Sequence, residues 1–277
     1  MKFNSLGLLF TLVVLPLTLQ AQFIDFQSGG TLVNGNSLSG TVTNEGWDQL
    51  NTTRISNPNA TGGPSAGGSS TRPYGSHNNT AGWYNWVWDG SAYVATTPST
   101  IASNLGSGSS TLWKSSGYGY VGGESIHQGL PSASIIPGGN FEVESLAIAD
   151  LETLVFQVNA TDRAGDVFSA FPTLSFGSTT ISADFSSLYL QVYKGISFGE
   201  AQYYNYYAFQ WDLSDYVFAG GESLSINWTG LTNSGVFGLQ LNQGDTFVQV
   251  VPEPSTWVML LAGVGVVAYL KRRRCSN

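Results

Sequence analysis

Apolar side chains recur at every second position through the second half of this chain. Four runs show the spacing: Leu154, Phe156, Val158; Leu188, Leu190, Val192; Leu224, Ile226, Trp228; and Phe237, Leu239, Leu241. Alternate residues of an extended chain project to the same side, so the spacing predicts strands with one apolar face. Turn residues separate the runs, which favours an all-β, antiparallel β-sandwich of jelly-roll type. A second packed sheet is needed to bury so many large side chains.

The composition agrees with a β-rich body that folds without cross-links. Of the 277 residues only 10% are charged, against roughly 25% in an ordinary domain, and 13% are aromatic. This excludes a disordered chain, which needs high net charge and few apolar residues. The one cysteine is Cys275, the third residue from the end, so the body has neither a disulfide nor a thiolate zinc site.

Basic residues gather at the two ends of the chain. Between Gln22 and Val250 there are five Lys or Arg and seventeen Asp or Glu, a net charge of −12. Phosphate backbones repel so acidic a body, because nucleic-acid binding depends on clustered Lys and Arg. We therefore predict one body over residues 22–250 that binds no nucleic acid. A Gly/Ser/Asn-rich stretch near 51–80 is predicted to be a long loop within it.

Residues 1–21 have the features of a secretory signal peptide. Lys2 precedes an apolar run that ends at Leu19, and the small residue Ala21 marks the predicted cleavage site. The alternative is a permanent N-terminal anchor, which Pro16 and the shortness of the run disfavour. The protein is therefore predicted to be exported.

Residues 251–277 contain three features in a fixed order. Pro252-Glu253-Pro254 comes first, an apolar stretch over 256–270 follows, and Lys271-Arg272-Arg273-Arg274 comes directly after it. As a helix the apolar stretch rises ~22 Å, short of the ~30 Å hydrocarbon core, but long basic side chains extend toward the headgroups and make a short span viable. The positive-inside rule keeps the basic cluster cytoplasmic and places the body across the membrane.

This ordered triple, paired with a signal peptide, resembles the PEP-CTERM sorting signal of Gram-negative bacteria. The resemblance implies recognition by an exosortase, a membrane-embedded protease or transpeptidase that processes the chain near the Pro-Glu-Pro motif. Carried over by position, Pro252, Glu253 and Pro254 would be the recognition residues, and Lys271 to Arg274 the stop-transfer cluster. Proteins with this signal are associated with exopolysaccharide, biofilm or floc material. The resemblance thus implies a destination and no activity.

Candidates for catalysis are sparse. His77 and His127 are the only histidines, and their spacing is not that of a helical zinc motif. A Ser-His-Asp triad stays open, because triads are recognised by geometry rather than spacing. Within a strand, Glu142 and Glu144 would point to the same face, either as paired acids of a glycoside hydrolase or as charges that keep an exposed face soluble.

Metal and cofactor sites have weaker signals still. Asp162 and Asp166 flank a turn and are weak candidates for calcium ligands, since the pattern of a dedicated calcium loop is missing. There is also no glycine-rich phosphate loop. We predict no bound cofactor.

Aromatic side chains are the most suggestive feature of the body. Exposed planar rings can stack on sugar faces, and the candidates for this role are Trp83, Trp86, Tyr204 and Tyr206. The alternative is that these rings fill the core of a large sandwich. The sequence predicts an exported, noncatalytic protein of the cell surface or extracellular matrix. A carbohydrate-binding module and a secreted glycoside hydrolase are the alternatives.

Overall fold

A computed structural model describes most of the β-rich body. The described residues are 38–47, 50, 81, 83, 86–88, 93–95, 100–106, 110–122, 125–129, 137–162, 166–197 and 200–249. They form strands and turns, and all of the strand pairs are antiparallel, which confirms the all-β prediction. The predicted signal peptide 1–21, the predicted loop 51–80 and residues 251–277 lie outside the described residues.

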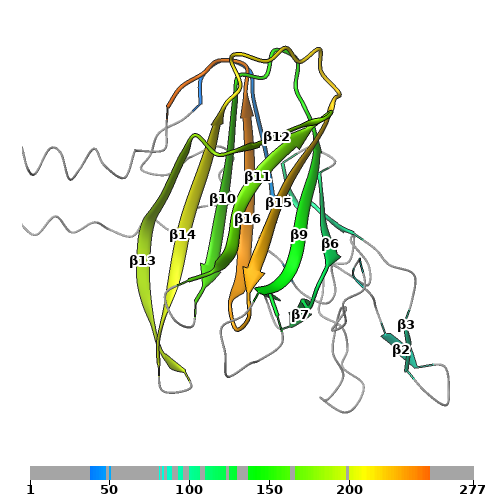
Figure 1. The fold of residues 1–277 in the computed structure, drawn as a ribbon, viewed down its shortest axis with the longest axis vertical. Coiled ribbons are helices and arrows are strands. Elements are labelled where there is room, and N and C mark those ends of the chain that lie inside the picture. Colours follow the sequence, from blue (N-terminus) through cyan, green and yellow to red (C-terminus); the bar gives the residue numbers. More distant parts are fainter. Residues whose placement is uncertain are drawn as a thin grey trace, which may run out of the picture.

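Two sheets make up the sandwich (Figure 1). The larger sheet has the strand order β13-β14-β10-β16-β1-β5, and β8 pairs with β16 and β7 beside it. Its strands are β1 (Val42–Trp47), β5 (Leu105–Gly106), β7 (Tyr120–Gly122), β8 (Ser125–His127), β10 (Thr153–Thr161), β13 (Phe185–Ser197), β14 (Glu200–Asp212) and β16 (Gly235–Gly244).

The smaller sheet packs over the larger one and has the order β12-β11-β15-β9-β6-β4. Its strands are β4 (Ile101–Ala102), β6 (Thr111–Ser116), β9 (Pro137–Leu146), β11 (Phe168–Phe176), β12 (Thr179–Ser182) and β15 (Ser223–Leu231). A separate hairpin pairs β2 (Trp86–Trp88) with β3 (Tyr93–Ala95). The finer assignment to the jelly-roll type stays a prediction.

The core lies between the two sheets, on the faces that the alternation predicts for β10 and β15. On β16 the prediction is wrong for Phe237, because a bulge puts Val236 in the core instead and the Phe237 ring packs on Tyr204. Leu154, Phe156 and Val158 of β10 are fully buried, and so are their counterparts on β15 and β16, Leu224, Ile226, Trp228, Leu239 and Leu241. The ring of Phe141 stacks between Trp83 and Trp228, with centroids 6.0 and 5.6 Å away. Aromatic packing of this kind adds about 0.5–1.5 kcal/mol per pair beyond the area buried.

The prediction for the run at Leu188 and Leu190 is wrong. A bulge between these residues shifts the register of β13, so that Leu188 pairs with Tyr207 and Leu190 with Tyr206. Neighbouring residues of β14 face opposite sides, hence the two leucines do not share a face. Leu188 is 45% exposed because β13 is the edge strand of the larger sheet.

A lysine is buried among the apolar side chains. Lys114 on β6 is 0% exposed, and its Nζ donates a hydrogen bond to the carbonyl oxygen of Gly117 at 2.8 Å. Burial disfavours the charged form and lowers the pKa of Lys114 to about 8. The hydrogen bond to Gly117, in the turn that follows β6, gives the buried amino group a partner.

The two ends of the described body meet at one end of the sandwich, at the top of Figure 1. Thr41 N–H donates to Asp245 Oδ1 at 2.8 Å, and Asp245 N–H donates to the Thr41 carbonyl at 3.2 Å. Gly40 makes this contact possible: its φ is +80°, and a Cβ there would lie 1.8 Å from Asp245 Oδ1. We call this the upper end; the β9–β10 and β14–β15 connections also lie there.

Candidate functional site

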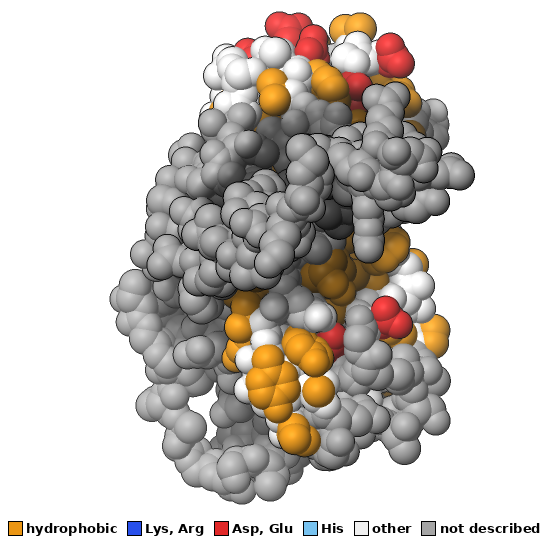
Figure 2. Space-filling model, turned by 90° about the vertical axis from the view of Figure 1, so that its left-hand side faces the viewer, with side chains coloured by type: hydrophobic (Ala, Val, Ile, Leu, Met, Phe, Trp, Pro, Cys, Tyr) orange, Lys and Arg blue, Asp and Glu red, His pale blue; other side chains and the backbone are white. Residues whose placement is uncertain are grey.

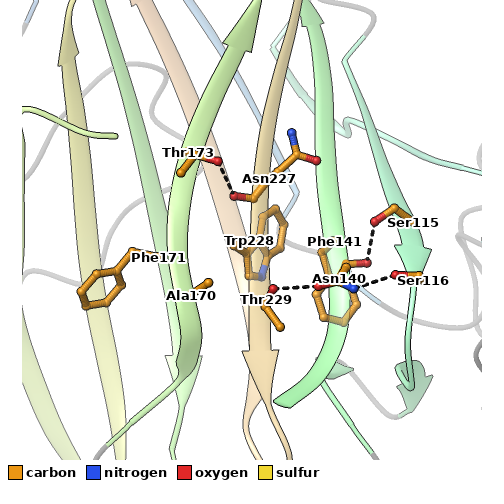
Figure 3. A pocket seen from close by; sticks show the side chains of 10 residues that line it. All are labelled: Ser115, Ser116, Asn140, Phe141, Ala170, Phe171, Thr173, Asn227, Trp228 and Thr229. Atoms are coloured by element: carbon orange, nitrogen blue, oxygen red, sulfur yellow. Dashed lines mark hydrogen bonds between the residues drawn. The ribbon is translucent and has the colours of Figure 1, made fainter. Parts of the chain in front are cut away.

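The outer face of the smaller sheet carries a candidate site. The alternation that buries Ile226 and Trp228 of β15 turns Asn227 and Thr229 outward. With polar residues of β6, β9 and β11 they surround a hollow of about 330 Å³ (Figure 3). The lining residues are Ser115, Ser116, Asn140, Phe141, Ala170, Phe171, Thr173, Asn227, Trp228 and Thr229.

Asn140 organises one side of the hollow through contacts with two neighbouring strands. Its Nδ2 donates to Ser116 Oγ at 2.6 Å, and its Oδ1 accepts from Thr229 Oγ1 at 2.7 Å. The hydroxyl of Ser115 donates to the Asn140 carbonyl oxygen at 3.3 Å. These bonds run across β6, β9 and β15 and hold the polar groups in place before any ligand arrives.

Asn227 offers hydrogen-bonding capacity on the other side. Its Nδ2 donates to Ser225 Oγ at 2.7 Å, and its Oδ1 accepts no hydrogen bond from a described residue. Thr173 on the neighbouring β11 donates from Oγ1 to the Asn227 carbonyl at 3.5 Å. An amide oxygen accepts up to two hydrogen bonds, so Asn227 is available to a donor on a ligand.

Phe171 stands at the rim of the hollow as an exposed ring. Its side chain is 62% exposed, although its ring still contacts Phe168 and Phe209, with centroids 5.9 and 5.8 Å away. The register of β11 against β15 shifts on both sides of Ala170, and such bulges re-aim side chains. In Figure 3 the ring lies apart from Trp228 and Phe141. The ring is turned toward Phe209 on the inner face of the larger sheet, so it lies as an exposed apolar surface beside the polar groups and not over the hollow.

Glu142 and Glu144 lie on this outer face beside the hollow. Ser225 Oγ donates to Glu142 Oε1, and Thr111 Oγ1 donates to Glu144 Oε2 at 3.3 Å. Both carboxylates therefore bind hydroxyls of the neighbouring strands, and neither is among the residues that line the hollow.

Two of the four rings predicted to stack on sugar are buried. Trp83 is 0% exposed, stacks on Phe141, and donates from Nε1 to the Leu112 carbonyl at 3.2 Å. Tyr206 is 2% exposed, and this burial raises its pKa. We therefore remove both from the candidate surface. Strand parity does place Tyr206 on the outer face of β14, but parity does not reveal that Tyr189 packs against it.

The other two rings differ from these. Tyr204 is half-buried: its ring lies 5.6 Å from that of Phe237, and Lys194 Nζ lies 5.2 Å from both ring centroids. This is a cation–π arrangement that occupies one side of the ring. The side chain of Trp86 lies outside the described residues.

The remaining candidates do not come together. Asp162 is fully buried, and its two oxygens accept from Tyr203 N–H at 3.2 Å and Asn205 Nδ2 at 2.9 Å. Asp166 is exposed, His127 is half-buried at the end of β8, and His77 lies outside the described residues. Within the ranges that the structure describes, no group of three His, Cys, Asp or Glu side chains is arranged to hold a metal ion.

Sequence reasoning missed the hollow. Asparagine is depleted in strands, but it stands inside six of them here, so Asn140 and Asn227 carried no signal that singled them out. The two asparagines are 87 positions apart, so only the pairing of β15 with β9 brings them to one face.

Comparison with known proteins identifies the C-terminal segment as a sorting motif. The family model of the PEP-CTERM protein-sorting motif matches residues 250–274, which confirms the resemblance noted above. The motif implies export, transient C-terminal anchoring in a membrane and processing by an exosortase. None of the curated proteins and none of the solved structures matches the chain. The described part of the body has no helix long and apolar enough to cross a membrane; the predicted span 256–270 lies outside it.

Proposed function

We propose that this exosortase-sorted protein is a noncatalytic component of the cell surface or extracellular matrix, held there by binding a neutral exopolysaccharide in the hollow of the smaller sheet. The sorting motif at 250–274 supports the destination. The observation that carries the binding role is the exposed Phe171 ring beside a set of uncharged hydrogen-bonding groups.

The chemistry of the hollow matches that of a sugar chain. Sugar hydroxyls both donate and accept hydrogen bonds, which suits the amide of Asn227 and the hydroxyls of Thr173 and Thr229. The C–H face of a pyranose ring can pack on Phe171. No lining residue is ionisable, and Glu142 and Glu144 nearby would repel an anionic polymer. These features favour a neutral polysaccharide.

The arrangement of the carboxylates supports a noncatalytic role. A glycoside hydrolase needs two carboxyl groups on opposite sides of the scissile bond. Glu142 and Glu144 are instead next-but-one neighbours on one strand, each engaged by a hydroxyl of an adjacent strand. A hydrolase remains the competing hypothesis, and it predicts that Glu142→Gln abolishes cleavage of a polysaccharide that the protein binds.

Affinity electrophoresis of the processed protein in gels that contain neutral polysaccharides tests the proposal. We expect retardation of the wild type, and a loss of affinity of about tenfold for Phe171→Ala, which corresponds to about 1.4 kcal/mol of binding free energy. Tyr193→Ala is the matched control, because Tyr193 is 58% exposed on the other sheet. The proposal fails if no polysaccharide retards the wild type, or if both variants lose the same affinity.

A further inference from the structure

The chain leaves the body along the outer face of the larger sheet. After β16 ends at Gly244, residues 245–249, which we call the exit segment, turn at the upper end and run toward β13 (Figure 1). The family match begins at residue 250, directly after this segment. The sorting motif is therefore joined to the body by a stretch that is itself packed on the body.

Two side chains of the larger sheet hold the exit segment by its backbone. Thr153 Oγ1 on β10 donates to the Thr246 carbonyl at 3.0 Å and accepts from Val248 N–H at 3.3 Å. Gln210 Nε2 on β14 donates to the Val248 carbonyl at 2.6 Å. The segment thus crosses from β16 over β10 to β14, and a single hydroxyl serves as both donor and acceptor for it.

Further contacts make this a docking site. Phe247 N–H donates to Glu152 Oε2 at 2.9 Å, and the Phe247 ring stacks on Phe185 with centroids 6.4 Å apart. Val248 packs against an apolar cluster on this outer face, separate from the main core, made of Leu38, Val155 and Ala208. Side chain–backbone hydrogen bonds and two consecutive apolar anchors thus hold the segment on the face of the sheet.

The dock limits how far the motif can extend from the body. Pro252 is four residues beyond Val248, the last anchored residue, so it lies at most about 14 Å from that anchor. The upper end bears the carboxylates of Asp150, Glu152, Asp184, Asp212, Asp215, Glu222 and Asp245, and no described residue of these loops is a Lys or Arg. Figure 2 shows red side chains gathered at this end. An acidic end of this kind is not attracted to anionic lipid.

We propose that docking of the exit segment on Thr153 and Gln210 slows processing at the sorting motif, by keeping the bulky body too close to the membrane for the motif to enter the protease freely. A tether that barely spans its site lowers the effective concentration of the tethered group, and lengthening it raises that concentration. Release of the five docked residues adds up to about 17 Å of reach. The proposal rests on the sorting motif and is independent of polysaccharide binding.

Pulse-chase immunoblots of the full-length chain in its own host test the proposal. Thr153→Val removes both hydroxyl contacts without changing the shape of the side chain, and a second variant inserts about eight Gly/Ser residues between Gln249 and Val250. We expect each variant to be processed about threefold faster or more. Thr180→Val is the matched control, a threonine of β12 on the smaller sheet that bonds Ser175, and it should leave the rate unchanged.

Hydrogen exchange of the purified precursor reports the dock itself. The amides of Phe247 and Val248 should exchange slowly in the wild type and faster in Thr153→Val. Wild-type or slower processing of the spacer variant overturns the proposal, whatever Thr153→Val does, because the spacer leaves the body intact. Release of the amides without faster processing overturns it as well.

Discussion

Outward-facing polar residues alternate with core residues along the strands of both sheets, but the outer face of the smaller sheet is partly open to solvent and much of that of the larger sheet is buried. On the smaller sheet the outward residues of β9 and β15, such as Asn140 and Asn227, are partly exposed and surround an open hollow. On the larger sheet the outward residues Gln157, Gln240 and Asn242 are at most 1% exposed. Polar side chains therefore mark the outward face of a strand, but they do not show that the face is open to solvent.

The buried outer face also leaves polar groups unsatisfied. Gln157 Nε2 and Oε1, Asn159 Oδ1 and Gln240 Oε1 have no hydrogen-bond partner in the part of the chain that the structure describes. Unpaired buried groups cost free energy, so the buried amides of this face lower the stability of the fold. The smaller sheet instead pairs most of its polar groups across strands and keeps Asn227 Oδ1 available. The larger sheet docks the exit segment, and the contrast is the reason why we propose ligand binding on the smaller one.

The largest effect is expected when one side chain is removed from each outer face. Tyr206→Ala on the larger sheet should lower the free energy of unfolding by about 3–5 kcal/mol, because it deletes a buried ring. Thr229→Ala on the smaller sheet should cost about 1 kcal/mol or less. Denaturant unfolding of both variants measures the difference. Equal, small losses would show that the outer face of the larger sheet is an ordinary surface.

A smaller effect should distinguish the amides of the two faces. Gln157→Met keeps the length of the side chain and removes two unpaired buried atoms, so we expect the free energy of unfolding to rise by about 1–2 kcal/mol. Asn227→Leu is the matched change on the open face, because it likewise keeps the size of the side chain, and it should bring no such gain. A loss of stability in Gln157→Met would mean that the amide has a partner in solution.

The smallest effect concerns acid and the upper end. Hydrogen bonds from backbone N–H groups, that of Ala219 foremost, hold the pKa of Glu222 below its ordinary value, and hydrogen bonding with Thr41 lowers the pKa of Asp245. A carboxyl group whose pKa is lower in the folded than in the unfolded state stabilises the fold at every pH above its unfolded-state pKa. It loses that contribution as the pH falls through the folded-state pKa. Stability should therefore decline below about pH 4.5.

Glu222→Gln and Asp245→Asn should flatten this decline in unfolding curves recorded at pH 7, 5 and 3. Asp166 is exposed and accepts no hydrogen bond from a described residue, so Asp166→Asn serves as the control. Variants with the same acid limb as the wild type would show that these carboxylates do not hold the upper end together.

Particular residues show how much of the fold could be predicted from the sequence. The parity of Leu154, Phe156 and Val158 predicted their burial, because alternation along one strand is a local property. The same rule was wrong for Leu188 and Leu190, since the bulge between them arises from the pairing of β13 with β14. Parity also placed Tyr206 on the correct face without revealing its cover. Local patterns predict the side of a strand but not its neighbours.

The sequence by itself determined the β-rich class, the acidic body and, through the motif at 250–274, the sorting of the protein. These properties depend on composition and on short contiguous segments, so they can be predicted without knowing any long-range contact. The tertiary structure alone decided which polar residues share a hollow and which outer face is closed. Ser116, Asn140 and Thr229 meet only because strands distant in sequence pair, and the alternation leaves open which strands will do so.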